Sequence, residues 1–319
     1  MNFPVSSTKL CCDDKSEQPI CCRLLSWIAL WLLGGCLSLV ISVATSTAQN
    51  YQSYHIGLKE GLPTYFTKSI NQDSLGFIWI ATDAGVVRYD GSTFKVFKDK
   101  LTSLYTKEVY KNNSGALIIL SDQGIYKILH DGNEANFEVM VEGNDEPADS
   151  TVYYPRDIYQ ASNGDYWISE PRGISRYSPQ TNKLRRYTLP ESLHSTSYTH
   201  SFYVFERAGQ IYCLSYNDGQ LFRYQKKMDS FEPFISSSPF SNSWVEDYEL
   251  LSNGDLLATG QRGIYKLNFK TGTYSKNWTQ VSYIDNVTAL TSNKGNLYVG
   301  TTNGRILKRT PDTAAAHLA

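Results

Sequence analysis

The sequence has very little cysteine beyond its N-terminal segment and no long run of charge of one sign. Its six cysteines are Cys11, Cys12, Cys21, Cys22, Cys36 and Cys213. Once the N-terminal segment is cleaved off, only Cys213 remains, and a lone cysteine cannot form a disulfide within one chain. We therefore expect Cys213 to be a free thiol and the body of the protein to be stabilised by its packed core. The paired cysteines have no histidine nearby, so the ligand spacing of a zinc site is not met.

Charge is balanced and methionine is rare. The formal net charge is −1 without any basic stripe, so a nucleic acid is not expected as a partner. Hydrophobic residues reach 41%, which is enough for a large core and excludes wholesale disorder. The chain has 23 tyrosines and no useful length of helical periodicity beyond the N-terminus, which favours strands.

The N-terminus differs from the rest of the chain. Leu24–Ala44 is an uncharged apolar run of 21 residues, preceded by Arg23 and followed by small residues at Ser46–Ala48. This pattern predicts a cleaved secretion signal over residues 1–48, with the product beginning near Gln49. The alternative is an uncleaved membrane anchor, because 21 residues can span a bilayer. Either way we expect a periplasmic or extracytoplasmic protein that touches the membrane only through this segment.

An internal repeat, aligned by two glycines, covers most of the chain. The six copies read "DSLGFIWIATDAGVVRYD", "NNSGALIILSDQGIYKIL", "ASNGDYWISEPRGISRYS", "ERAGQIYCLSYNDGQLFRY", "LSNGDLLATGQRGIYKLN" and "SNKGNLYVGTTNGRILKR". The first glycines are Gly76, Gly115, Gly164, Gly209, Gly254 and Gly295. The second glycines are Gly85, Gly124, Gly173, Gly219, Gly263 and Gly304. Successive copies are about 44 residues apart, which is the length of a four-stranded propeller blade.

The first copy predicts four strands joined by hairpin turns. The strands are Phe66–Asn71, Phe77–Thr82, Val86–Tyr89 and Thr93–Phe97. The turns contain Gly76, Asp83–Gly85 and Asp90–Gly91. We predict an all-β propeller of four-stranded antiparallel blades over residues 49–310, either six-bladed or an incomplete seven-bladed ring. Residues 311–319 are expected to be a disordered or truncated tail.

Closure of the ring requires a strand from one of the chain's ends. The sixth copy supplies three strands, and Pro311–Ala319 is poor strand material. Tyr51–Ile56 precedes the first copy and has no hairpin partner of its own. We therefore expect Tyr51–Ile56 to be the outer strand of the closing blade.

Aromatic residues recur at equivalent positions of several copies. Trp79 and Trp167 correspond to each other, as do Tyr89, Tyr177 and Tyr224. A residue that recurs in this way is expected to pack between blades. The alternative is a platform on which a sugar ring stacks.

The first copy resembles the repeat of the two-component regulator propellers. The shared positions are Gly61, Leu62, Asp73, Gly76, Trp79, Ile80, Thr82, Gly85, Arg88, Tyr89, Gly91 and Phe94. The third copy shares Gly164, Trp167, Ile168, Gly173, Arg176 and Tyr177. Members of this family form the extracytoplasmic sensor half of hybrid histidine kinases, chiefly in Bacteroidetes-type bacteria. The resemblance implies a sensor of glycan-derived signals.

The sequence departs from that family in what it lacks. Such sensors usually carry two seven-bladed propellers, an immunoglobulin-like domain, a membrane span and a kinase core. No segment here resembles a phosphoacceptor box, an ATP-binding site, a receiver or a helix-turn-helix. We therefore expect no kinase activity in this chain, which is a fragment of a longer sensor or a stand-alone propeller. The expected partners are an oligosaccharide ligand and a second propeller, a kinase-bearing protein or another copy of the chain.

A search for catalytic constellations singles out no residue. The acidic loop Glu142–Asp149 lacks the alternating order of a calcium loop and is expected to be an exposed insertion. His194 and His200 are expected to be loop residues and not metal ligands. Sequons at Asn112, Asn277 and Asn286 are interpreted as turns. The sequence thus predicts no catalytic residue, metal site or cofactor, and it names no ligand-binding residue.

Three functions stay open at this point. The first is a sensor or binding module outside the cytoplasm. The second is a propeller enzyme such as a polysaccharide lyase, a glycoside hydrolase or a relative of the streptogramin lyases, which have similar repeats and a histidine-containing site in one funnel. The third is a structural propeller in a surface assembly. A histidine and a carboxylate converging on the central axis would favour the enzyme.

Overall fold

The computed structural model describes residues 54–309 and 317–318, except 131, 133, 147, 194–201, 236–237, 241–242, 261–262 and 279–286. Residues His55–Ala319 form one compact unit, and Met1–Tyr54 form another in which only Tyr54 is described. The predicted signal or anchor at residues 1–48 lies outside the described residues. Among the described residues, no helix is both long and apolar enough to cross a membrane.

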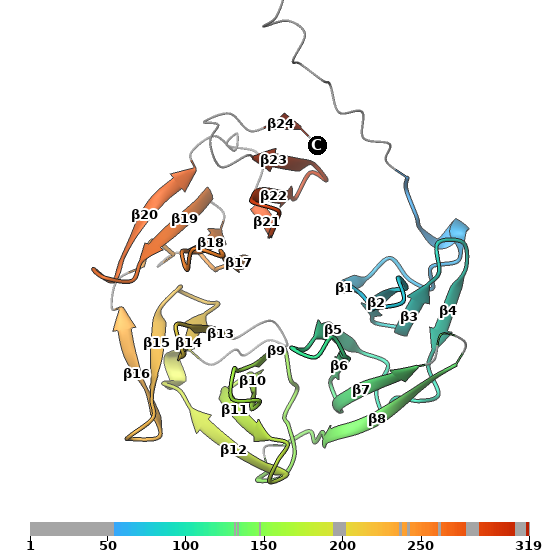
Figure 1. The fold of residues 1–319 in the computed structure, drawn as a ribbon, viewed down its shortest axis with the longest axis horizontal. Coiled ribbons are helices and arrows are strands. Elements are labelled where there is room, and N and C mark those ends of the chain that lie inside the picture. Colours follow the sequence, from blue (N-terminus) through green and yellow to red (C-terminus); the bar gives the residue numbers. More distant parts are fainter. Residues whose placement is uncertain are drawn as a thin grey trace, which may run out of the picture. The chain divides into compact units, whose positions relative to one another are not determined.

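The unit His55–Ala319 is a six-bladed β-propeller in which each blade is built from four consecutive antiparallel strands (Figure 1). Blade one contains β1 (Thr67–Gln72), β2 (Ile78–Thr82), β3 (Gly85–Tyr89) and β4 (Phe94–Phe97). Blade two contains β5 (Thr106–Lys111), β6 (Leu117–Ser121), β7 (Gly124–His130) and β8 (Ala135–Glu142). Blade three contains β9 (Asp157–Gln160), β10 (Tyr166–Glu170), β11 (Gly173–Ser178) and β12 (Lys183–Thr188).

The other three blades repeat this order. Blade four contains β13 (Phe202–Arg207), β14 (Gln210–Ser215), β15 (Leu221–Gln225) and β16 (Ser230–Ile235). Blade five contains β17 (Asp247–Leu250), β18 (Leu256–Gly260), β19 (Gly263–Asn268) and β20 (Thr273–Trp278). Blade six contains β21 (Val287–Asn293), β22 (Asn296–Thr301), β23 (Ile306–Arg309) and β24 (His317–Leu318). Two short 3-10 helices, η1 (Leu58–Glu60) and η2 (Glu191–Leu193), lie in connections. Figure 1 shows the first strand of every blade nearest the centre.

The two glycines of each repeat make the hairpins possible. Gly76 has φ of 96° in the turn between β1 and β2, a conformation that favours a residue without Cβ. Gly85 has φ of 105°, and a Cβ there would lie 2.6 Å from the carbonyl oxygen of Phe97. The first turn is also fixed by a side chain. Asp73 accepts hydrogen bonds from the backbone N–H groups of Leu75 and Phe77, as Asn112 does from Ala116 in blade two.

The hydrophobic core is divided into layers between neighbouring blades. Val109 of β5 packs with Trp79 and Ala81 of blade one, and Ile158 of β9 packs with Ile118 of blade two. Similar clusters join blades three and four, four and five, and five and six. Each first strand therefore buries one side chain against the blade that precedes it in the sequence.

Blade one is the exception to this layering. Ile70 of β1 occupies the position equivalent to Val109, since it pairs with Ile80 as Val109 pairs with Ile119. Yet Ile70 is 65% exposed, whereas Val109 is 2% exposed. The cluster of Leu62, Ile80 and Val87 belongs to blade one alone. Among the described residues, the seam between blades six and one is therefore open (Figure 1).

The structure corrects two predictions about the ends of the chain and one prediction about a turn. The fourth strand of blade six is β24, which pairs with β23 and lies within the segment that we expected to be poor strand material. β24 fills the outer place of blade six and residues 54–56 form no strand, which contradicts the expectation for that part of Tyr51–Ile56. Residues 51–53 lie outside the described residues. Asn277 lies in β20 and not in a turn, whereas the turn predicted at Asn112 is confirmed. Asn286 lies outside the described residues.

Candidate ligand-binding funnel

The recurring tryptophans pack in the core, as predicted, and form no platform. Trp79 and Trp167 are both buried. Trp79 stacks on Phe97 with ring centroids 5.5 Å apart, and Trp167 meets Tyr224 edge-on at 4.8 Å. Tyr224 is buried as well. Trp79, Trp167 and Tyr224 thus hold blades together, whereas Tyr89 stacks on Phe94 within blade one. A ligand site must be sought elsewhere.

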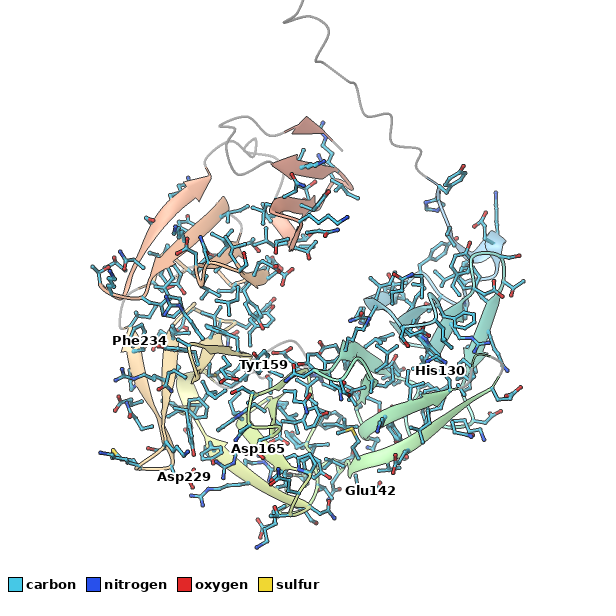
Figure 2. All side chains as sticks on the ribbon, in the orientation of Figure 1. His130, Glu142, Tyr159, Asp165, Asp229 and Phe234 are labelled. Carbon is cyan, nitrogen blue, oxygen red and sulfur yellow. The ribbon has the colours of Figure 1, made fainter. Side chains whose placement is uncertain are left out.

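A cavity of about 890 Å³ lies between the first strands of the blades, at the centre of the molecule. Residues from all six blades line it, and we call it the funnel. Its walls combine aromatic rings with charged and hydroxyl side chains, including Tyr159, Tyr203, Tyr216, Tyr248 and Thr291. Figure 2 shows side chains reaching into this central space, with Tyr159 labelled at its edge. Such a mixture of rings and polar groups suits a small polar ligand.

In five blades an equivalent residue lines the funnel, either at a bulge in the first strand or directly before that strand. The pairing of β1, β5 and β21 with the next strand shifts at Lys68, Lys107 and Thr288. In blade three, Arg156 donates its backbone N–H to Ser169, which is also the pairing partner of Asp157. In blade five, Glu246 likewise donates its backbone N–H to the Thr259 carbonyl, and Thr259 is also the pairing partner of Asp247. A bulge re-aims a side chain and is common beside functional sites.

We call these five residues the bulge ring, and all of them line the funnel. They are Lys68, Lys107, Arg156, Glu246 and Thr288. Their positions are equivalent, and their side chains are three cations, one carboxylate and one hydroxyl. All five are polar, whereas the equivalents of Trp79 in the second strands, such as Ile118 and Leu257, are hydrophobic, which marks the ring as a candidate for recognition. The described pairing of β13 in blade four begins at Phe202 without a shift.

The bulge ring has opposite character on its two sides. Lys68, Lys107 and Arg156 come from three consecutive blades, and Asp122 lies 3.2 Å from the Lys107 Nζ and 3.3 Å from the Arg156 Nη1. Burial lowers the pKa of Lys107, repulsion by Arg156 and Lys68 lowers it further, and attraction by Asp122 opposes both. Glu246 and Thr288 stand on the remaining blades, and Glu246 accepts a hydrogen bond from the indole of Trp244.

Beyond the bulge ring, polar side chains tie each first strand to the next. The Ser69 hydroxyl accepts a hydrogen bond from the Val109 N–H at 3.2 Å, and Asp157 accepts one from Val204 at 3.1 Å. Asp247 accepts one from Leu290 at 2.8 Å. In these three bonds the acceptor belongs to the earlier blade.

A second rung repeats this arrangement two residues further along the strands. The Tyr110 hydroxyl accepts from the Gln160 N–H at 2.9 Å, and Glu249 accepts from the Ser292 N–H at 3.1 Å. These acceptors satisfy backbone groups on the open edges of the first strands, which would otherwise be buried without partners. The carboxylates of the funnel therefore have a structural role in joining blades.

Burial makes these carboxylates unusually basic. It raises the pKa of Asp157 to about 6, against the lowering effect of the Val204 and Ile158 N–H groups. It raises the pKa of Asp247 to about 7, and that of Glu108 well above its usual range, where repulsion by Asp157 adds to the effect. Near neutral pH the interior of the funnel thus carries less negative charge than its composition indicates.

The other residues considered in the sequence lie away from the funnel. Glu142–Asp149 follows β8 as a largely exposed insertion before blade three, as predicted. His130 of β7 lies beside Asp73 between blades one and two, with its Nε2 3.3 Å from the Asp73 Oδ2. His194 and His200 fall outside the described residues. No histidine lines the funnel among the residues that the structure describes.

Sequence reasoning missed the bulge ring because its residues lie outside the glycine-anchored motif. The repeats were aligned on the second and third strands, where packing imposes the same residues. The first strands vary, and a bulge changes which side of the strand a residue occupies. The available signal was charge. Lys68, Lys107 and Arg156 are cations at or directly before the start of the first strand in three successive repeats.

Neither a scan against protein-family models nor a search of curated proteins found a match. Solved structures share the fold. The extracellular domain of a protein described as a hybrid two-component system from B. thetaiotaomicron is 20% identical with a TM-score of 0.63, over 81% of this chain and 35% of that chain. One described as a one-component system from the same organism is 19% identical with a TM-score of 0.61, over 85% and 34%.

Propellers of another kind are similar to the same degree. Virginiamycin B lyase from Staphylococcus aureus is 14% identical with a TM-score of 0.60, over 80% of this chain and 84% of that chain. This chain spans about a third of the length of the two B. thetaiotaomicron domains. At these identities the likeness shows the propeller fold, and function must be argued from the funnel.

Proposed function

We propose that this chain is an extracytoplasmic, ligand-binding sensor propeller of a two-component signalling system and that glycan-derived ligands occupy its funnel. The observation that carries the proposal is the bulge ring, in which five polar side chains at equivalent positions line one cavity beside tyrosine rings. Hydroxyl-rich ligands are recognised by such combinations of hydrogen-bonding groups and aromatic faces. The fold shared with the extracellular domains of signalling proteins supports the sensor role.

Transmission of a signal requires that the ligand favours one arrangement of the blades over another. A ligand across the bulge ring contacts residues from blades one, two and three on one side and from blades five and six on the other. Binding would therefore bias the spacing of the blades around the axis. Any kinase that reads this change lies outside the chain, on a longer protein or on a partner.

A propeller enzyme is the alternative, and the lyases of the same fold are the reason to test it. Two observations favour the sensor. The histidines among the described residues do not line the funnel. The carboxylates Asp157 and Asp247 in its wall accept hydrogen bonds from backbone N–H groups of neighbouring blades, so their role is to join the blades.

The test is a calorimetric screen of the full chain against neutral and acidic oligosaccharides, with chromatography of every mixture after prolonged incubation. We expect a ligand that binds and is recovered intact. Tyr216→Ala, which removes a ring from the funnel wall, should weaken that binding, whereas Tyr65→Ala, an exposed ring outside the funnel, should not. Recovery of shortened or unsaturated products would establish the enzyme instead, and the absence of any binder would count against the sensor.

A further inference from the structure

Three cations lie side by side on one wall of the funnel. Lys68, Lys107 and Arg156 occupy the bulge positions of blades one, two and three, and all three line the cavity. We call them the basic arc. The exposures of the three differ: Lys68 is exposed, Lys107 is partly buried and Arg156 is buried. A ligand therefore meets Lys68 and Lys107 first, with the Arg156 charge behind them.

Two cations of the basic arc share a carboxylate. Asp122 contacts both Lys107 and Arg156. The pKa of Lys107 is lowered by burial and also by repulsion from Arg156 and Lys68, which shows that the three charges act on one another. A negatively charged group placed among them would relieve this repulsion, because the attraction between opposite charges is strong in a partly buried site.

The acidic groups of the funnel are directed to other partners. Asp157 accepts a hydrogen bond from the backbone N–H of Val204, and Glu108 accepts one from the backbone N–H of Ile158. Each carboxylate is therefore bonded to the next blade. Glu246 lies in the wall formed by blade five and is bonded to Trp244. The funnel thus offers a positive wall on blades one to three and, across from it, a hydrogen-bond acceptor and the hydroxyl of Thr288.

We propose that the basic arc binds the anionic group of an acidic sugar, a carboxylate or a sulfate, while the hydroxyl groups of the same sugar face Glu246 and Thr288. This inference rests on the proposed function, because it names the ligand class of the same funnel. The two anions share the chemistry that a pair of lysines recognises, and the experiment separates them.

The experiment measures binding of digalacturonate, a sulfated disaccharide and an uncharged disaccharide to the full chain by calorimetry. In the double variant Lys68→Gln with Lys107→Gln we expect at least a tenfold loss of affinity for the acidic sugar that binds, and no change for a neutral one. Asp122→Asn removes the carboxylate that Lys107 and Arg156 share and should strengthen acidic binding severalfold. The matched control is Lys98→Gln with Lys100→Gln, two exposed lysines that lie after β4 and outside the funnel. Melting temperatures verify that every variant is folded.

Salt provides a second readout, since raising the sodium chloride concentration should weaken acidic binding and leave neutral binding unchanged. Equal affinity of the double variant and the original chain for the acidic sugars would overturn the inference. So would binding of the neutral sugar alone, an outcome that leaves the proposed sensor function standing. If neither class of sugar binds, the inference fails, and the broader screen described above decides the proposed function separately.

Discussion

The indole N–H of Trp79 donates a hydrogen bond to the buried carboxylate of Asp73 at 2.6 Å. The other oxygen of the same carboxylate accepts the backbone N–H groups of Leu75 and Phe77 in the turn that follows β1. One side chain therefore joins the shape of the turn to the packing of the core between blades one and two. This explains why an aspartate and a tryptophan six positions apart belong to the same repeat motif.

Replacement of Trp79 by alanine should cost about 3–5 kcal/mol of the free energy of unfolding, because Trp79 is fully buried against Phe97. Trp79→Phe keeps most of the packing but leaves Asp73 without its indole donor, and should cost about 1–3 kcal/mol. Urea denaturation measures both values. Tyr65→Ala, at an exposed ring, is the control and should be nearly neutral. A Trp79→Ala chain of unchanged stability that has lost ligand affinity would instead support the aromatic platform.

The open seam predicts different costs for two equivalent isoleucines. Ile158→Ala should lose about 2–5 kcal/mol, because Ile158 is buried between blades two and three. Ile70→Ala should change the free energy of unfolding by no more than about 0.5 kcal/mol, because Ile70 is exposed on blade one. Urea denaturation of the two variants under identical conditions makes the comparison. A large loss at Ile70 would mean that another part of the protein covers blade one in solution.

The buried carboxylates predict that stability falls as pH rises through the weakly acidic range. Burial raises the pKa of Asp157 to about 6 and that of Asp247 to about 7, whereas both titrate near 4 when the chain is unfolded. Between these values the native state binds more protons than the unfolded state. The two groups therefore destabilise the fold as they ionise, and this effect is complete above their native pKa values.

Urea denaturation at pH 5 and pH 8 measures this dependence. Asp157→Asn keeps an oxygen that can accept from Val204, so it should gain stability at pH 8 and flatten the profile between the two pH values. Asp90 is the contrasting case, because hydrogen bonds from Thr93 and Ser92 lower its pKa to about 2. Asp90→Asn should remove a stabilisation that is fully present above pH 4 and is lost as the pH falls toward 2, so it should leave the slope between pH 5 and pH 8 unchanged. A steeper profile in Asp157→Asn would contradict the assignment.

Cys213 should be unreactive in the folded protein. It is a free thiol, as the sequence predicted, it is buried in the core between blades three and four, and burial raises its pKa well above the usual range. Reaction with a disulfide reagent should be slow in native buffer and fast in urea. A chain in which the five N-terminal cysteines are replaced by serine isolates this thiol. Rapid labelling without denaturant would show that blades three and four separate readily.

The sequence predicted the blades well because their turns and packed strands repeat. Glycines such as Gly76 and Gly85 mark turns that need their conformation, and Trp79 and Trp167 mark strands packed between blades. The two-residue strand β24 was missed because Pro311–Ala319 has no strand-forming pattern, so its pairing with β23 is set by tertiary context. The funnel was missed for a related reason: residues such as Lys68 enter it through bulges, which break the alternation that sequence patterns rely on.

Along the axis, backbone N–H groups on a later blade, such as those of Val109 and Val204, donate to side chains on the earlier blade, such as Ser69 and Asp157. A ribosome delivers the chain in the same order. A blade that has folded therefore presents acceptors to the strand that emerges next, so a new blade can dock on a surface already in place. The ring can therefore grow blade by blade from its N-terminal end, with its contacts local in sequence and with no need to wait for the last strand.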